Sequence, residues 1–459
     1  GSYELSRKLL EEAKMSLDLA GQGAVYSVVI KNCGVEARWE EARELVEEMH
    51  ALKVPRDEFT YGCALNVYKE AGKWRTAIDL FRRMKDDGVE PNIVAYNTCI
   101  GACAMFGRPP MSKYARGEGR PSVQRQSSQP GTLTETQVEA VRAGDAALGL
   151  LDEMLENGVE PDVITYGSLM SALGPRGAQG ADAVLELFDR LVREKRVAPS
   201  TIIYVLVIRA WGDKGEWRRA EKMLTEMHEV YGLTPNRFCY AAVIKALANG
   251  GQWQRALDKI DEMRELGMTP DHIVYMSAVG ACEQCGQWGE ALRTLQKMIA
   301  DKHPKHALTW AYNSVINTLG RARQLEAAKE LVENMKASGI KPDQYTYACL
   351  MRAVGVAGSW EESLVLLDEM EGAGIAANLV VYNTIVTSLA KAEQHEEVEA
   401  MLARMRRSNV APDVTTYTAM LWRCTGDADW AVAEEIVAEM RASGIKPNTR
   451  TCAAMVKVH

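Results

Sequence analysis

Apolar residues recur at helical spacing in pairs of short stretches along the chain. Between residues 309 and 343, one apolar face consists of Tyr312, Val315, Ile316 and Leu319. After a break at residues 320–324, a second face consists of Leu325, Ala328, Leu331, Val332 and Met335. Because residues at i, i+3, i+4 and i+7 share one side of a helix, the two stretches predict a helical hairpin, with a first helix A and a second helix B.

The end of each hairpin carries a turn signal. Gly339 suits the left-handed position after a helix end, and Pro342 prevents the helix from continuing. The same tail recurs as GVEPN, GVEPD and GIKPN. Because no run alternates apolar and polar residues between turn residues, the sequence predicts no strands. The fold class is therefore expected to be all-α.

The hairpin repeats with a nearly constant period of about 35 residues. Its first marker is a tyrosine, at Tyr26, Tyr61, Tyr96, Tyr166, Tyr204, Tyr240, Tyr275, Tyr312, Tyr347, Tyr382 and Tyr417. Its second marker closes the units, at Asp57, Asn92, Asp162, Asn236, Asp271, Asp343, Asn378, Asp413 and Asn448. Units that pack only on their neighbours form an α-solenoid, which we expect to wind as a right-handed superhelix. We expect eleven repeats and a partial twelfth over residues 23–459, preceded by a partial repeat helix and an expression-derived Gly-Ser in residues 1–22.

The repeated words resemble those of the pentatricopeptide repeat family in its P-type form. VAYNTCI, VVYNTIV and AYNSVIN open units, and LFRRMKDDGVEPN and IVAEMRASGIKPN close them. The resemblance covers nearly the whole chain. The tetratricopeptide repeat is the nearest alternative, but its W-x-x-L-G-x-x-Y signature is missing and the dominant step is 35 rather than 34 residues.

The resemblance implies that each repeat reads one base of a single-stranded RNA with two side chains, the residue after the tyrosine and the last residue of the unit. The pairs that match the family are Asn97–Asp162, Asn313–Asp343 and Asn383–Asp413 for uracil, Thr418–Asn448 for adenine and Ser27–Asp57 for guanine. The pairs that depart from it are Gly62–Asn92, Gly167–Ser200, Val205–Asn236, Ala241–Asp271, Met276–Leu308 and Ala348–Asn378. The implied target, read from its 5′ end, is G-?-U-?-?-?-?-U-?-U-A.

A third position lies two residues before each tyrosine. It holds Ala24, Phe59, Val94, Ile164, Ile202, Phe238, Ile273, Trp310, Tyr345, Val380 and Thr415. The resemblance implies that this side chain inserts between successive bases, which flat apolar groups suit. The alternative is ordinary packing at the start of helix A. The tryptophans that start helix B, at Trp74, Trp217, Trp253, Trp288 and Trp360, are expected to belong to the core between repeats.

Charge is distributed unevenly. The formal net charge of −8 argues against nucleic acid at first sight. The eight-residue windows that begin at the tyrosines nevertheless contain no Asp or Glu, and they hold Lys31, Arg209, Lys245, Arg352 and Arg423. The acidic residues lie mainly in the B segments. Helix A is thus predicted to present a mildly basic surface and helix B an acidic one, unless the B charges are only solvated i,i+4 pairs.

The step of 70 residues contains an insertion rather than a repeat. Residues 108–142 are assigned to a low-complexity insertion in the third repeat, with poor order predicted from Arg108 to Thr132 and helix B resuming near Ala146. Two interpretations of this insertion stay open: a tolerated surface insertion, or a basic arm that attracts RNA phosphates.

No catalytic or metal motif is found. Cys282, Cys285, His303 and His306 superficially resemble a zinc set, but helix B separates the two pairs by about 18 Å. The ten scattered cysteines favour a reducing compartment over a disulfide framework.

We therefore expect a non-catalytic, cofactor-free monomer that binds single-stranded RNA and no membrane. The resemblance implies an organelle, chloroplast before mitochondrion, and a role in transcript stabilisation, processing or translation. Two alternatives stay open. One is a protein-binding scaffold in an organellar ribosome or RNA polymerase complex, and the other is the RNA-binding part of a larger enzyme.

Overall fold

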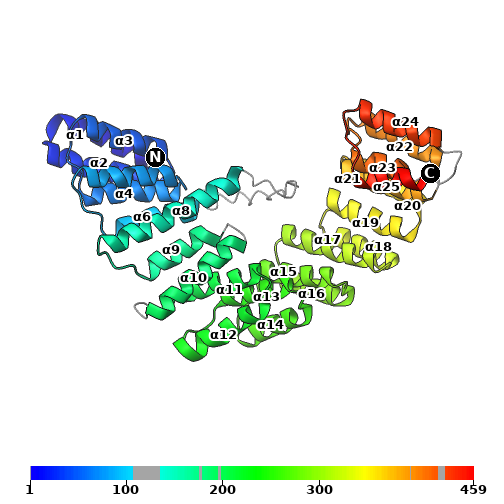
Figure 1. Cartoon of the computed structure of the whole chain (residues 1–459), viewed down its shortest axis with the longest axis horizontal. Helices are drawn as coiled ribbons and strands as arrows, with labels where there is room; N and C mark the ends of the chain where they lie inside the picture. The colour runs from blue at the N-terminus through cyan, green and yellow to red at the C-terminus, as the bar shows by residue number, and fades with distance from the viewer. Residues whose placement is uncertain are drawn as a thin grey trace. The chain divides into compact units, whose positions relative to one another are not determined.

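The computed structural model describes residues 2–106, 135–174, 178–194, 198–392, 394–421 and 430–458. These residues form 24 α-helices and no strand, so the predicted all-α class is confirmed (Figure 1). The chain divides into two compact units, residues 1–246 and 247–459. The predicted disorder from Arg108 to Thr132 lies outside the described residues.

The helices alternate between the A and B types that the sequence predicts. The A helices are α2 (Leu19–Val35), α4 (Glu58–Glu70), α6 (Ile93–Met105), α9 (Val163–Leu173), α11 (Thr201–Asp213), α13 (Arg237–Asn249), α15 (His272–Gln284), α17 (Lys305–Arg321), α19 (Gln344–Ala357), α21 (Leu379–Lys391), α23 (Val414–Leu421) and α25 (Thr449–Val458). Helix α1 (Ser2–Ser16) precedes them.

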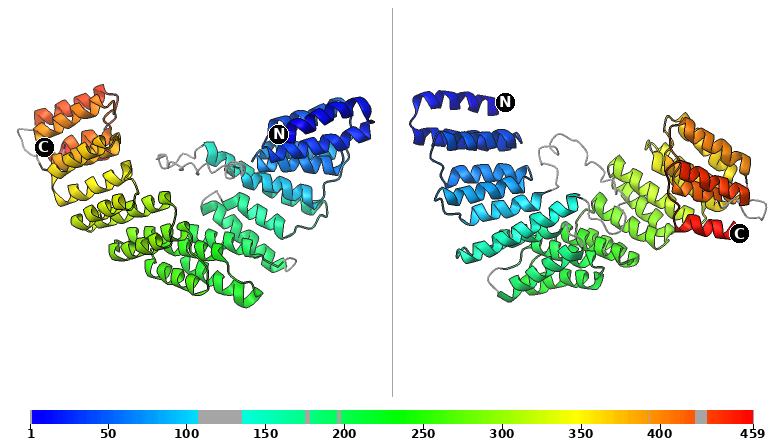
Figure 2. Two further views of the ribbon diagram at one scale, coloured as in Figure 1. Left: turned by 180° about the vertical axis from the view of Figure 1, so that it is seen from behind. Right: turned by 45° about the horizontal axis from the view of Figure 1, so that its top comes forward.

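The B helices complete the hairpins. They are α3 (Trp39–Ala51), α5 (Trp74–Asp86), α8 (Glu135–Glu156), α10 (Ala178–Glu194), α12 (Trp217–Tyr231), α14 (Trp253–Glu265), α16 (Trp288–Ala300), α18 (Leu325–Ala337), α20 (Trp360–Gly372), α22 (His395–Arg407) and α24 (Trp430–Ala442). Within each compact unit, an A helix packs on its own B helix and on the next A helix, as in α17 against α18 and α19 (Figure 2).

The two sequence markers have distinct structural roles. Each repeated tyrosine is buried, with at most 4% of its surface exposed. In several units its hydroxyl contacts the end of helix B: Tyr275 donates to Asp301 Oδ2 at 2.6 Å and Tyr382 to Ser408 Oγ at 3.0 Å. The closing Asp or Asn is the N-cap of the next A helix. Its side chain accepts the N–H three residues on, as Asp413 does from Thr416 at 2.9 Å.

Turn and core positions follow the same period. Gly339 has φ of +69°, which confirms the left-handed turn predicted after helix B. The methionine near the end of each B helix is completely buried in ten units, at Met49, Met84, Met154, Met227, Met263, Met298, Met335, Met370, Met405 and Met440.

Three helix boundaries differ from the sequence prediction. Helix α8 begins at Glu135 instead of near Ala146, so residues 135–142 belong to a helix and not to the insertion. Helix α2 begins at Leu19, before the boundary predicted at residue 22. Helix α17 begins at Lys305, and Leu308 is therefore a buried residue inside the helix instead of a residue at its start.

The tryptophan prediction is wrong in part. Trp74, Trp217, Trp253 and Trp360 are half-buried, and Trp288 is 38% exposed. Each is the first residue of its B helix, and Trp360 packs against the core as a partly buried side chain.

Consecutive A helices approach most closely at small residues. A Cβ added at Gly320 of α17 would lie 2.7 Å from Ala353 Cβ of α19, and one added at Gly212 would lie 2.8 Å from Ala246 Cβ. Both distances are below van der Waals contact, so these glycines set the spacing between neighbouring A helices.

We predict that Gly320→Ala lowers the unfolding free energy by about 1–3 kcal/mol, because the added methyl forces α17 and α19 apart. Gly289→Ala is the matched control: no atom lies within 4 Å of its added Cβ, and the change should be neutral or stabilising by up to about 1 kcal/mol. Chemical denaturation of both variants measures the difference. Equal stability of the two would contradict the close approach.

Candidate nucleic-acid interface

Three of the expected base-reading pairs form the same hydrogen-bonded network. In one of them, Asn383 Nδ2 donates to Asp413 Oδ1 at 3.0 Å, while the hydroxyl of Thr416 lies 2.5 Å from Asn383 Oδ1 and 3.0 Å from Asp413 Oδ1. The other two are Asn97–Asp162–Thr165 and Asn313–Asp343–Thr346, with Asn to Asp distances of 3.1 Å in each. The structure thus brings together the side chains that the sequence pairs for uracil.

Two further pairs are joined through a threonine. Ser27 Oγ lies 2.8 Å from Thr60 Oγ1, which donates to Asp57 at 2.6 Å. Thr418 Oγ1 lies 2.9 Å from Thr451 Oγ1, which donates to Asn448 at 3.0 Å. The reader and the closing residue are neighbours in these units as well.

The remaining pairs lack this arrangement. Among the described residues, no side-chain hydrogen bond joins Gly62 to Asn92 or Ala348 to Asn378, because glycine and alanine offer no polar group. The amide of Asn92 instead donates to Glu58. The same holds for the pairs Gly167–Ser200, Val205–Asn236, Ala241–Asp271 and Met276–Leu308, whose first members carry no hydrogen-bonding side chain.

The carboxylates of Asp413 and Asp57 are kept ionised. Burial of Asp413 raises the pKa of its carboxyl, but hydrogen bonds from the Thr416 N–H, Asn383 and the Thr416 hydroxyl outweigh this effect and hold the pKa below its usual value of 3.8. Hydrogen bonds from Thr60 lower the pKa of Asp57 in the same way. Each carboxylate can therefore act as a hydrogen-bond acceptor at neutral pH.

The position two residues before each tyrosine is exposed in all eleven units. Nine of these side chains are large and apolar, with 38% to 68% of their surface accessible. They are Phe59, Val94, Ile164, Ile202 and Phe238 in residues 1–246, and Ile273, Trp310, Tyr345 and Val380 in residues 247–459. Packing at the helix start does not explain them, since they remain accessible. They form what we call the apolar stripe.

Grooves link the apolar stripe to the reading positions. A groove of about 470 Å³ is lined by Val380, Asn383, Asp413, Thr415 and Arg352, among others. A second groove, of about 570 Å³, is lined by Phe59, Val94, Gly62, Asn92 and Lys31, among others. Both offer apolar and hydrogen-bonding groups side by side, which is the chemistry that a nucleobase requires.

The predicted basic residues on helix A are accessible. Lys31, Arg209, Lys245 and Arg352 are exposed, whereas Arg423 lies outside the described residues. Arg352 donates to the side-chain oxygen of Asn317, whose amide in turn donates to Glu283. The positive charge of Arg352 is therefore offset locally by the carboxylate of Glu283, to which Asn317 connects it.

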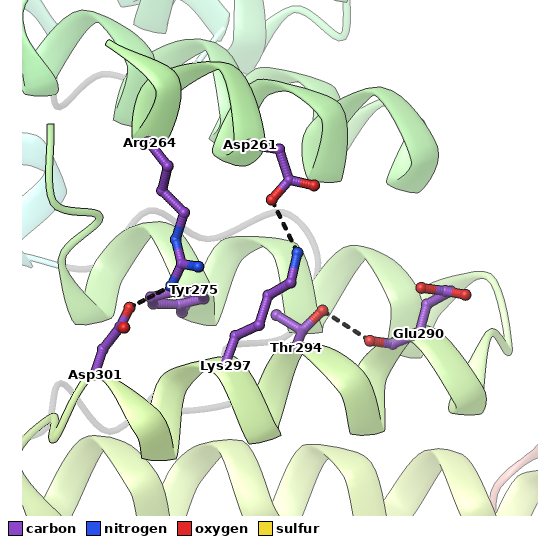
Figure 3. Close-up of polar contacts among 7 residues, drawn as sticks. All are labelled: Asp261, Arg264, Tyr275, Glu290, Thr294, Lys297 and Asp301. Carbon is purple, nitrogen blue, oxygen red and sulfur yellow. Dashed lines mark hydrogen bonds and ion pairs between the residues drawn. The ribbon is translucent and has the colours of Figure 1, made fainter. Parts of the chain in front are cut away.

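The acidic B helices pair their charges between repeats. Arg264 Nη2 of α14 lies 2.6 Å from Asp301 Oδ2, and Lys297 Nζ of α16 lies 2.9 Å from Asp261 Oδ1. Figure 3 shows both ion pairs. The hydroxyl of Tyr275 contacts the same Asp301 carboxylate. Comparable bridges are Lys329–Glu362, Lys336–Glu369 and Arg404–Asp368. The i,i+4 pairs suggested by the sequence are thus supplemented by bridges between neighbouring B helices.

Metal and membrane sites were also considered. No group of three His, Cys, Asp or Glu side chains could hold a metal ion within the described part of the chain, so Cys282, Cys285, His303 and His306 form no such cluster. None of the described helices has the length and apolar character that a membrane crossing requires.

Sequence reasoning missed the threonines that join the pairs. Thr60, Thr165, Thr346, Thr416 and Thr451 are all buried, and each is the third residue of an A helix. A usable signal was present, because each follows the closing residue in the pattern [DN]-x-x-T.

Comparison with known proteins confirms the repeat assignment. The PPR repeat family matches residues 56–105, 309–356 and 377–426; the pentatricopeptide repeat domain matches 138–176, 149–214 and 406–459; and the PPR repeat matches 24–54, 202–230, 238–268, 273–303 and 345–375. The chain belongs to the pentatricopeptide repeat family.

Curated relatives share limited identity. A chloroplastic pentatricopeptide repeat-containing protein of Arabidopsis thaliana is 25% identical over 215 residues, covering 46% of this chain and 22% of its own length. A mitochondrial one from the same plant is 26% identical over 168 residues, covering 35% and 37%. The chain thus spans less than two fifths of the length of these relatives.

Solved structures of pentatricopeptide repeat proteins were found as well. PPR10 in complex with an 18-nt psaJ RNA element is 21% identical, with a TM-score of 0.37, over 100% of this chain and 84% of its own. The pentatricopeptide repeat domain of Arabidopsis thaliana protein-only RNase P 1 in complex with tRNA is 15% identical, with a TM-score of 0.29, over 47% and 94%.

We predict that Asp413→Asn lowers the unfolding free energy at pH 7 by up to about 1 kcal/mol, because a carboxylate accepts these hydrogen bonds more strongly than an amide oxygen. The folded pKa is lowered, so this contribution is present above the usual value of 3.8 and is lost as the pH falls through the folded pKa. Urea denaturation at several pH values measures it. A difference between wild type and variant that does not shrink below about pH 4 would contradict the assignment.

Proposed function

We propose that this chain binds single-stranded RNA in a sequence-selective manner, with about one base per repeat, and acts in the stabilisation, processing or translation of organellar transcripts. The observation that carries the proposal is the apolar stripe beside the reading networks. Val380 and Asn383 are three residues apart on α21, which places them on one side of the helix. An inserted apolar side chain and a base-reading amide would then contact the same nucleotide.

The chemistry of the networks supports selectivity for a pyrimidine edge. An Asn amide carries two N–H groups and an oxygen with two lone pairs, and the network occupies only part of this capacity. Asn383 donates one N–H to Asp413 and accepts one hydrogen bond from Thr416. The remaining donor and acceptor match the carbonyl and N–H groups of uracil. Six units lack a polar reader, so the expected target stays G-?-U-?-?-?-?-U-?-U-A.

An organellar location is part of the proposal. The names of the curated relatives include both chloroplastic and mitochondrial proteins. They support an organelle in general, and the preference for the chloroplast rests on the family resemblance alone. Because the chain spans only part of these relatives, the RNA-binding array could operate beside further domains, as in the alternative of a larger enzyme.

A scaffold that binds only proteins is less favoured. Two features favour it, the units that depart from the family's base-reading pairs and the acidic B surface. Many acids on that surface, however, are bridged to a neighbouring B helix, as in Lys297–Asp261 and Lys336–Glu369. A surface whose acidic side chains are already paired with basic ones attracts a basic partner less strongly. Meanwhile the accessible apolar side chains lie on the A helices and repeat with the period of the array.

The proposal is tested by gel-shift titration of the full chain with RNAs that carry the expected pattern. Affinity for single strands should fall with rising salt, and a duplex of the same sequence should bind much more weakly, because its bases are already stacked and paired. No binding to any RNA of a random pool, or equal affinity for duplex, would overturn the proposal.

We expect Val380→Ala to weaken binding to single-stranded RNA a few-fold, because it removes an apolar contact from the stripe. Val365→Ala is the matched control, since Val365 is similarly exposed, 66% against 59%, but lies on helix α20 of the B type. Tyr345→Ala should have the larger effect, about fivefold or more, because an aromatic ring stacks on bases. Equal losses for Val365→Ala and Val380→Ala would argue against the stripe.

Replacement of Asn383 by threonine, with Asp413 retained, should change the base preferred at the tenth position from uracil to guanine, as the family pattern implies. Base contacts discriminate by about 1–3 kcal/mol in the related DNA case, so a switch of about tenfold is expected. The fold should survive, because Thr418 occupies the equivalent position and bonds its own threonine at 2.9 Å. RNAs that differ only at that base measure the switch, with circular dichroism as the folding control. An unchanged preference would mean that this unit does not read RNA.

A further inference from the structure

The third residue after each closing residue is buried, and its type varies with the reader of the preceding repeat. Where that reader is polar, the third residue is threonine, in the pairs Ser27–Thr60, Asn97–Thr165, Asn313–Thr346, Asn383–Thr416 and Thr418–Thr451. Where the reader is glycine or apolar, the equivalent residue carries no hydroxyl, in the pairs Gly62–Ala95, Gly167–Ile203, Val205–Cys239, Ala241–Val274, Met276–Ala311 and Ala348–Val381. All eleven units follow this rule.

Helix capping does not account for the rule. A threonine at this position can bond the backbone of the N-cap residue, as Thr416 Oγ1 does when it accepts the Asp413 N–H at 3.1 Å. However, Asp271 and Asn378 are N-caps with side-chain hydrogen bonds, and they are followed by Val274 and Val381 instead of threonine. The presence of threonine therefore depends on the reader of the preceding repeat and not on the N-cap of its own helix.

The geometry of the hydroxyl explains what it does for the reader. Thr346 Oγ1 lies 2.6 Å from Asn313 Oδ1, while Asn313 Nδ2 lies 3.1 Å from Asp343 Oδ1. Only one orientation of the amide satisfies both partners, since the flipped amide would place its oxygen against the Asp343 carboxylate. The hydroxyl supplies the donor for the amide oxygen, which would otherwise be a buried acceptor without a partner in this network.

We propose that this threonine is a positioning residue for RNA selectivity: it fixes the orientation of the base-reading side chain of the preceding repeat and thereby determines whether that repeat discriminates between bases. The inference rests on the proposed function. Under this inference, the selectivity of a unit depends on three side chains: the reader, the closing residue and the threonine. The threonine acts through the reader and has no contact with RNA.

The first test uses the full chain and a pool of 11-nucleotide RNAs with the pattern G-N-Y-N-N-N-N-U-N-Y-A, in which Y, at the third and tenth bases, is uracil or cytosine. Thr416→Val keeps the shape of the side chain and removes the hydroxyl. It should reduce the preference for uracil at the tenth base about fivefold, the value of one hydrogen bond. The preference at the third base, read by Asn97, should not change. Thr416→Ser should restore the preference, since it restores the donor.

A second test introduces the polar reader, the closing Asp and the threonine into a unit that lacks a polar reader and its threonine. Ala348→Asn with Asn378→Asp supplies the reader and the closing residue, but the third residue of α21 is still Val381. We expect this double variant to gain little preference for uracil at the ninth base. Adding Val381→Thr should raise that preference about fivefold. Val381→Thr alone is the control, and it should leave every base preference unchanged.

The outcomes separate the inference from the proposed function. A wild-type chain without any preference at the tenth base would overturn the proposed function and this inference with it. A wild-type preference that survives in Thr416→Val would overturn the inference alone. A loss of preference at the third and tenth bases together would indicate a general structural effect of the substitution and would also overturn it.

Discussion

One carboxylate oxygen connects the folding of this array to its candidate chemistry. Oδ1 of Asp413 accepts the N–H of Thr416 at 2.9 Å, which caps helix α23, and it accepts the amide of Asn383 at 3.0 Å. The first bond starts a helix and the second orients a side chain of the helix before it. Because both bonds use the same atom, the start of α23 and the position of Asn383 cannot vary independently.

The two layers of helices satisfy different physical requirements. The A helices approach each other closely through small residues, as at Gly320 and Ala353, and the third residue after each closing residue is buried. The B helices carry most of the acidic residues and bridge many of them to basic side chains of neighbouring repeats, as in Arg264–Asp301. These acidic residues are neutralised within the B layer, so the formal net charge of −8 does not determine the potential at the A helices.

The period of the sequence predicted the repeated elements well because each repeat places the same residue types in the same local environment. The tyrosine, the closing Asp or Asn and the turn glycine recur in register, and the structure places them in the core, at the N-cap and in the left-handed turn. Positions that break the register were predicted poorly. Helices α8 and α17 begin earlier than expected, at Glu135 and Lys305.

The threonines were missed for a different reason. The pattern [DN]-x-x-T marks them, but their partner lies 33 or 68 residues away, in the preceding repeat, so the pattern does not reveal the contact. They also show how affinity and selectivity can be separated along one array. The position of the apolar stripe is exposed in all eleven units, whereas a polar reader with its threonine is present in five. Under the proposed function, the exposed positions of all units contribute affinity without regard to sequence, and the five complete networks distinguish bases. The six units without a polar reader would then act as spacers between the reading units.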